Sequence, residues 1–157
     1  MKYFTPSEAV KFINSGESVY IQGSTSIPEV LCKALADRGD ELRDVTIYAA
    51  FAVGRCEAPF CRPEYKDSFN IKSLFVANNI RKWLAAGYGS TIPAFLGEIP
   101  GLFRDGTLPL DAVFLNVSQP NDEGYCSFGV SADLAVSAVE CASKVIVQVN
   151  KAMPFSY

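Results

Sequence analysis

Apolar residues in this chain fall into short runs that alternate with segments of helical spacing. Runs rich in β-branched and other apolar residues predict strands over residues 18–22, 45–53, 71–76, 111–117 and 144–150. Apolar positions three or four residues apart predict helices over about residues 28–39 and 131–143, and a short helix is expected over residues 79–86. A capping box at residues 5–8 predicts a further helix over about residues 7–14. Residues 90–103 are ambiguous, and we expect a short strand followed by a helix that Pro100 interrupts. Because the strands are apolar on both faces, the pattern predicts an α/β domain, an open and mostly parallel sheet covered by helices.

Composition limits the class of protein. A chain of 157 residues is most simply one domain, and its 49% hydrophobic and 20% charged residues are typical of a globular protein. The net charge of −3, without a cluster of Lys and Arg, gives no reason to expect nucleic acid as a partner. The longest apolar run, residues 45–53, is too short to span a bilayer, and Pro6 and Glu8 break the apolar core that a signal peptide needs. We therefore expect a cytoplasmic protein that has no membrane partner.

Cysteine and histidine usage limits the chemistry of the chain. The five cysteines are scattered without a CxxC pair, so we expect reduced thiols. The chain has no His, and Cys56 and Cys61 lack a second pair at zinc-site spacing, so we expect no metal site. Without His, neither a Ser-His nor a Cys-His pair can form, which makes Cys126 a poor candidate nucleophile. The residue pattern thus predicts no catalytic group in this chain.

In an open α/β sheet, ligands bind beyond the carboxyl ends of the strands, and two loops are placed there. The first is QGSTSIPE, after the first predicted strand. Gly23 permits a sharp turn, and the small residues Ser24, Thr25 and Ser26 leave the backbone accessible. The helix that follows favours an anion at its N-terminus, such as a carboxylate, a phosphate or a developing oxyanion. The alternative is a plain strand-to-helix turn in which Ser26 is the N-cap.

The second loop is NVSQPNDEGYCSF, residues 116–128. It follows a strand that reads as buried on both faces, and its polar residues are expected at the same edge of the sheet. We expect it to form a wall of a substrate cleft through Ser118, Pro120, Asp122 and Gly124. The alternative is a wide turn, because Pro, Asn, Asp and Gly are all turn formers.

Several segments of the chain resemble one family, the acetyl-CoA hydrolase/CoA-transferase family, in its N-terminal domain. They are GSTSIPEVLCKAL, EAPFCRPEYKDSF, SLFVANNIRKWLAAG and the long stretch from YGSTIPAFLGEIPGLF to VIVQVNKAMP. The resemblance covers nearly the whole chain, and SQPNDEGYCSFGVS is its most specific part. The family includes 4-hydroxybutyrate and butyryl-CoA:acetate CoA-transferases. It implies the α/β fold that CoA-transferases share with ribose- and glucosamine-phosphate isomerases.

The resemblance also implies an activity. In the family, a glutamate carboxylate attacks an acyl-CoA thioester, and a glutamyl-CoA intermediate passes CoA to a second carboxylic acid. That glutamate and most CoA-binding segments belong to the family's second domain. No motif here matches the nucleophile, and the residues that do not correspond to it include Glu29, Glu57, Glu98, Glu123 and Glu140. Residues 1–157 are therefore expected to be the N-terminal domain of a longer protein, with the two loops as the acyl and carboxylate half of the cleft.

The resemblance leaves other readings open. Water in place of the acceptor acid would make the enzyme an acetyl-CoA hydrolase, and the same sheet could serve as a non-catalytic binding module. The expected partners are acyl-CoA, a short-chain carboxylate and the second domain, with coenzyme A as a substrate and no separate cofactor. We also expect a homo-oligomer or an exposed apolar patch, because Met153, Phe155 and Tyr157 follow a buried strand.

Overall fold

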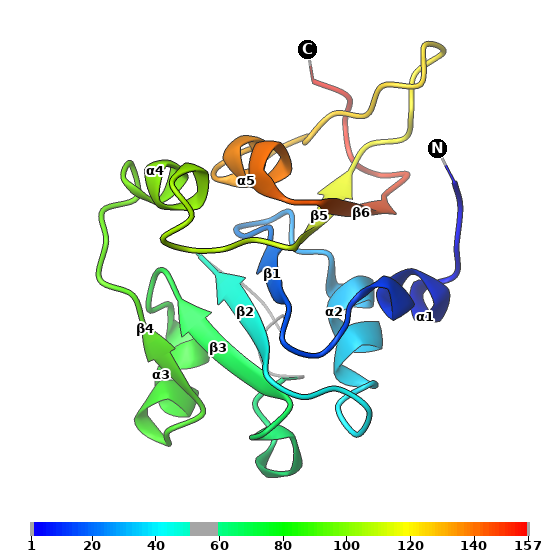
Figure 1. The fold of residues 1–157 in the computed structure, drawn as a ribbon. Helices are drawn as coiled ribbons and strands as arrows, with labels where there is room; N and C mark the ends of the chain where they lie inside the picture. Colours follow the sequence, from blue (N-terminus) through cyan, green and yellow to red (C-terminus); the bar gives the residue numbers. More distant parts are fainter. Residues whose placement is uncertain (1, 51–59, 157) are drawn as a thin grey trace.

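The structure is a computed structural model that describes residues 2–50 and 60–156. Within these residues, six parallel strands form one sheet (Figure 1). Their order across the sheet is β4-β3-β2-β1-β5-β6. The strands are β1 (Ser18–Ile21), β2 (Val45–Ala49), β3 (Phe69–Ser73), β4 (Gly89–Thr91), β5 (Ala112–Val117) and β6 (Lys144–Val149). The prediction of an open α/β sheet is confirmed.

Short helices connect the strands. The α-helices are α1 (Pro6–Ala9), α2 (Glu29–Ala36), α3 (Asn78–Ala85), α4 (Ile99–Arg104) and α5 (Ala135–Cys141), and two 3₁₀ turns are η1 (Val10–Phe12) and η2 (Pro63–Tyr65). The first helix begins with a capping box, in which the Glu8 carboxylate accepts from the Thr5 N–H at 2.8 Å. Within the described residues, no helix is both long and apolar enough to cross a bilayer.

The sheet has an apolar core on each face. In β1, Val19 and Ile21 join the core under α1, α2 and α3, whereas Tyr20 points to the core under α4 and α5. This alternation follows from the two-residue period of a strand. Strand β5 is buried at all six positions, so the prediction of an inner strand is confirmed.

Some predicted boundaries are wrong for physical reasons. The third strand was expected over residues 71–76 but ends at Ser73, whose hydroxyl donates to the Phe75 carbonyl at 2.8 Å and bends the chain. Pro100 does not interrupt a helix, since it lies in the first turn of α4 where its missing N–H costs nothing. Residues 51–53 of the second predicted strand, with residues 55–59 of the expected irregular segment, lie outside the described residues.

The last strand differs most from expectation. Strand β6 is apolar in sequence but forms an edge of the sheet, and Val145 is 47% exposed. The chain then turns back toward the segment after β5, where the Ser156 N–H donates to Ser127 Oγ at 3.1 Å. Met153 and Phe155 are consequently half-buried rather than exposed, while Tyr157 lies outside the described residues.

Candidate functional site

The two loops singled out in the sequence follow neighbouring strands. Strands β1 and β5 pair in the sheet although Ser18 and Asp111, at their starts, are 93 residues apart in the chain. The chain leaves β1 for α2 on one face and leaves β5 for α5 on the other (Figure 1). Loops that diverge in this way mark the switch point of the sheet, which is the edge where ligands of open α/β proteins bind. The candidate site is therefore the carboxyl end of β1 and β5.

The first loop is shaped by close backbone packing. A Cβ atom on Gly23 would collide with the carbonyl oxygen of Ala50, so the glycine lets the end of β1 approach the end of β2. Ser24 follows with a φ of 55°, and Thr25 is exposed. Within the part of the chain that the structure describes, the hydroxyls of Ser24 and Thr25 have no hydrogen-bond partner, which leaves both able to meet a ligand.

Ser26 does not cap α2, so that part of the plain-turn alternative is wrong. The Ser26 N–H donates to the Gly23 carbonyl at 3.2 Å, and the N-cap position falls two residues later, at Pro28. The Val30 N–H is instead satisfied by Gln148 Oε1 of β6, at 3.1 Å. Ser26 is fully buried, and within the described residues its hydroxyl has no partner.

The second loop is a hairpin that projects beyond the sheet, the yellow segment after β5 in Figure 1. The Ser118 N–H donates to the Ser127 carbonyl at 3.0 Å, and the Ser127 N–H donates to Ser118 Oγ at 2.9 Å. Nearer the tip, Asn121 Oδ1 accepts from the Tyr125 N–H at 2.9 Å, while the Asn121 N–H donates to the Tyr125 carbonyl at 2.9 Å. Ser118 is thus buried in the base of the hairpin, where it fastens the two arms together.

The remaining predicted residues of this loop lie farther out. Pro120 is half-buried, and Asp122 and Gly124 are exposed at the tip. Gly124 has a φ of +84°, which is the conformation that makes glycine suitable for the turn. Among the described residues, no hydrogen bond or ion pair connects Asp122 to residues 23–26.

The polar contacts between the start of the first loop and the segment before α5 were not predicted. Gln22 is fully buried and donates through Nε2 to the Ser131 carbonyl at 2.6 Å. The Tyr20 hydroxyl donates to Asp133 Oδ1 at 3.1 Å, and the other carboxylate oxygen of Asp133 lies 3.5 Å from the position of a Cβ on Gly23. The segment before α5 thus contacts the start of the first loop through Ser131 and Asp133. In the sequence, the one sign of these contacts is that Gln22 is polar and ends an apolar strand.

The described residues contain no activated nucleophile. Burial raises the pKa of the Cys126 thiol, so its protonated, unreactive form is favoured at neutral pH. No group of three or more Cys, Asp or Glu residues in the described part of the chain could hold a metal ion. The site can therefore bind and orient, but it carries no visible covalent chemistry of its own.

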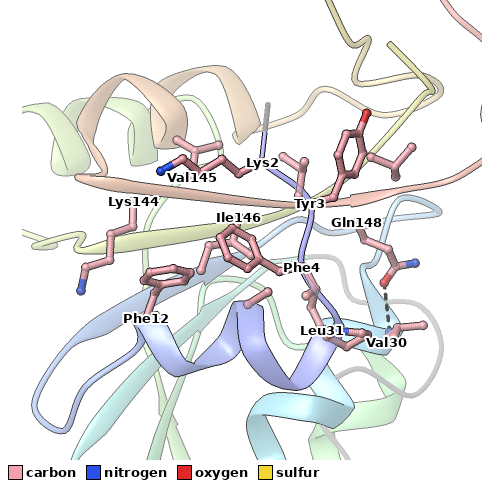
Figure 2. Close-up of a pocket in the computed structure, with 14 residues that line it drawn as sticks. Lys2, Tyr3, Phe4, Phe12, Val30, Leu31, Lys144, Val145, Ile146 and Gln148 are labelled. Atoms are coloured by element: carbon pink, nitrogen blue, oxygen red, sulfur yellow. Dashed lines mark hydrogen bonds between the residues drawn. The ribbon is translucent and has the colours of Figure 1, made fainter.

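A separate apolar groove of about 650 Å³ lies along β6. Figure 2 shows the N-terminal segment with Tyr3 and Phe4 crossing this strand, and Phe12 beside Ile146. Lys144, at the start of the strand, forms an ion pair with Glu17 at 2.5 Å. The described residues of the two predicted loops do not line this groove, so it is distinct from the switch point.

Comparison with known proteins identifies the family. The sequence model of the family described as the acetyl-CoA hydrolase/transferase N-terminal domain matches residues 1–156. The chain is 34% identical over 153 residues to the 4-hydroxybutyrate coenzyme A transferase of Clostridium kluyveri, covering 98% of this chain and 35% of that protein. It is 32% identical over 151 residues to the succinyl-CoA:acetate/propanoyl-CoA:succinate CoA transferase of Fasciola hepatica, covering 95% of this chain and 31% of that protein.

Solved structures of two proteins share the fold of this chain. RipA from Yersinia pestis superposes with a TM-score of 0.87 at 28% identity, covering 97% of this chain and 37% of that one. The 4-hydroxybutyrate CoA-transferase of Porphyromonas gingivalis superposes with a TM-score of 0.76 at 31% identity, covering 98% of this chain and 34% of that one. The chain spans about a third of the length of the curated relatives it matches. It belongs to the acetyl-CoA hydrolase/transferase family and matches the N-terminal domain of that family.

Proposed function

We propose that the full-length protein is a CoA-transferase that moves CoA between a short acyl-CoA and a carboxylic acid of the 4-hydroxybutyrate, butyrate or acetate type. The observation that carries this proposal is the 34% identity to a 4-hydroxybutyrate coenzyme A transferase over 98% of the chain. The relative from Fasciola hepatica, at 32% identity, is also a CoA transferase. Coenzyme A is then a substrate, and the reaction needs no further cofactor.

The proposed reaction uses a glutamate of the part of the protein that this chain does not include. Its carboxylate attacks the thioester carbonyl of the acyl-CoA, forming a mixed anhydride and releasing the CoA thiolate. The thiolate attacks the glutamyl carbonyl, which releases the acyl group as its carboxylate and forms a glutamyl-CoA thioester. A second carboxylate repeats the two steps in reverse order and leaves as its CoA ester. Covalent catalysis divides one difficult transfer into easier steps in this way.

This chain would supply the acyl and carboxylate side of the cleft. Ser24 and Thr25 lie at the switch point with free hydroxyls, within the part of the chain that the structure describes. They can donate to a carboxylate or to a developing oxyanion, and such donors act most strongly where water is excluded. The second domain would cover this edge of the sheet and bring the glutamate to it.

The test is an assay of the full-length protein with acetyl-CoA and either butyrate or 4-hydroxybutyrate as acceptor. We expect the new acyl-CoA to form, and hydroxylamine to trap a glutamyl hydroxamate after incubation with acetyl-CoA. Residues 1–157 alone should transfer no CoA, because the nucleophile is absent. Release of free CoA at a rate independent of the acceptor would identify a hydrolase instead. Binding of acyl-CoA without turnover by the full-length protein would make the domain a binding module, and either result would refute the transferase.

A further inference from the structure

Gln22 is a polar residue at a buried position, where an apolar side chain is more usual. It follows β1 and is fully buried. Its amide acts in both directions: Oε1 accepts from the Asn116 N–H of β5 at 2.8 Å, and Nε2 donates to the Ser131 carbonyl at 2.6 Å. One side chain therefore joins the end of β1 to the end of β5 and to the segment that leads into α5.

Tyr20 makes a second connection on the same face of β1. It precedes Gln22 by two residues, so both side chains point to the α5 side of the sheet. Its hydroxyl donates to Asp133 Oδ1 at 3.1 Å. Asp133 has a φ of 27°, an unfavourable backbone conformation for a residue with a side chain, and such strain persists where surrounding contacts hold it.

The two connections fix residues 131–133 relative to the end of β1. Residues 131–133 are held from β1 at both ends, and the Asp133 carboxylate lies next to Gly23 of the first loop. Gly23 follows Gln22 directly, so the side chain that orients residues 131–133 belongs to the same backbone that begins the first loop. A shift of Gln22 would therefore displace residues 23–26 and residues 131–133 together.

We propose that Gln22, assisted by Tyr20, is a positioning residue that sets the spacing between residues 23–26 and residues 131–133 and so the fit of the acceptor carboxylate. This inference rests on the proposed function for its kinetic readout. Gln22 is too buried to touch a substrate itself, and it acts through the backbone on both sides of it. Small displacements of residues that orient a substrate reduce the rate strongly, because reacting groups must be aligned closely.

The test compares two substitutions in the full-length protein, Gln22→Met and Gln22→Glu. Methionine has a similar size but neither donates to Ser131 nor accepts from Asn116, so kcat/KM for the acceptor acid should fall about tenfold or more at every pH. Glutamate keeps an acceptor for Asn116, and in its neutral form it can also donate to the Ser131 carbonyl. Burial favours the neutral form of a carboxylic acid. Gln22→Glu should therefore approach wild type near pH 6 and fall toward Gln22→Met near pH 8, within the range in which buried carboxyls titrate.

Three comparisons separate this effect from others. The titratable groups on this face among the described residues include Tyr20, Tyr48, Asp133, Cys126 and Cys141. The pH profile of Gln22→Met subtracts their contribution, because this variant retains all of them. Ile21→Val, on the opposite face of the same strand, should lower stability without changing kcat/KM. Tyr20→Phe removes only a hydroxyl and should lower kcat/KM by a smaller factor than Gln22→Met.

The outcomes are distinct. If wild-type protein transfers no CoA, the proposed function fails. If wild type is active and both Gln22 variants match it, or if Gln22→Glu shows the same fractional loss as Gln22→Met at every pH, the positioning role is refuted. Should Gln22→Met fail to fold, the pH profile of Gln22→Glu and the loss in Tyr20→Phe decide the matter, and a flat profile with wild-type activity in Tyr20→Phe refutes it.

Discussion

Gly23 lies directly against the carbonyl oxygen of Ala50, at the point where the chain leaves β1 beside the end of β2. The contact is between backbones, so neither partner can move aside as a flexible side chain would. This contact requires glycine at position 23, whether or not the loop binds a ligand. The loop is thus built on a packing constraint, and the groups available for binding are those that follow it, Ser24 and Thr25.

Substitution of Gly23 is therefore expected to destabilise the domain before it affects any chemistry. Gly23→Ala should reduce the free energy of unfolding by about 1–3 kcal/mol, as overpacked positions do. Gly97→Ala is the matched control, because a Cβ there would meet nothing within 4 Å. Urea unfolding of residues 1–157 measures both. Equal stability of the two variants would show that the ends of β1 and β2 can separate freely.

Asp122 provides the test of the hairpin as a cleft wall. Asp122→Asn should change the free energy of unfolding by no more than about 0.5 kcal/mol, because the side chain is exposed and both residues suit the turn. In the full-length protein we expect kcat/KM to fall at least tenfold, about 1.4 kcal/mol of transition-state stabilisation.

Asn121→Ala is the structural counterpart to that variant. It removes the acceptor of two backbone N–H groups, those of Glu123 and Tyr125, and should cost about 1 kcal/mol of stability. Wild-type kinetics in Asp122→Asn would reduce the hairpin to a turn that Asn121 maintains.

The edge of the sheet should be visible in amide hydrogen exchange of residues 1–157. In a parallel pair, a residue directs its N–H and C=O to the same neighbouring strand. The Lys144 N–H donates to the carbonyl of Asp111, the residue directly before β5. Ile146 and Gln148 lie two and four residues after Lys144, so their N–H groups also point to β5 and should exchange slowly. Val145, Val147 and Val149 direct theirs to the open edge and should exchange faster by at least an order of magnitude. Uniform protection along β6 would show that something covers the edge.

Self-association should depend on the same edge. An exposed apolar edge strand is a template for pairing with another chain, and a single Lys usually prevents such pairing. We expect residues 1–157 to form dimers or larger species in sedimentation experiments at high concentration, and Val145→Lys to reduce them. Val136→Lys is the control, since that valine is also 47% exposed but lies on α5. Monomers in all three samples would contradict the expectation.

Protonation of the Glu17 carboxylate should account for part of the loss of stability at low pH. Partial burial acts to raise the pKa of this carboxyl, but hydrogen bonds from Asn14 and Lys144 outweigh it and hold the pKa below its usual value. The unfolded chain then binds this proton more readily than the folded one. The stabilisation is present above the unfolded pKa of about 4.3 and is lost as the pH falls through the lower folded value.

Glu17→Gln should therefore show a smaller decrease of Tm than wild type when the pH is lowered from about 5 to about 3. Glu123→Gln, at the exposed tip of the hairpin, should retain the wild-type slope. If Glu17→Gln keeps that slope as well, the ion pair with Lys144 does not contribute to acid stability.

The fold was predictable because its signals are local. Alternation of apolar runs with helical spacing is enough to indicate a parallel sheet, and β5 is buried on both faces as its sequence suggests. The edge position of β6 was not predictable, because an apolar strand reads the same in the middle of a sheet as at its edge. The place of Gly23 at the switch point follows from strand order, whereas the bonds of Gln22 to Asn116 and Ser131 join parts of the chain about 94 and 109 residues away.

The pairing of β1 with β5 also bears on how the chain folds as it is synthesised. Strands β1 to β4 emerge from the ribosome first and can form three of their four strand pairings with one another. One side of β1 stays unpaired until β5, which begins more than ninety residues later, has been synthesised. Until then the edge of Val19, Tyr20 and Ile21 is open, and closing so long a loop slows the step that covers it. We therefore expect the sheet to be completed only after β5 has been synthesised, and a chain that stalls before residue 112 would leave this edge of β1 exposed to other molecules.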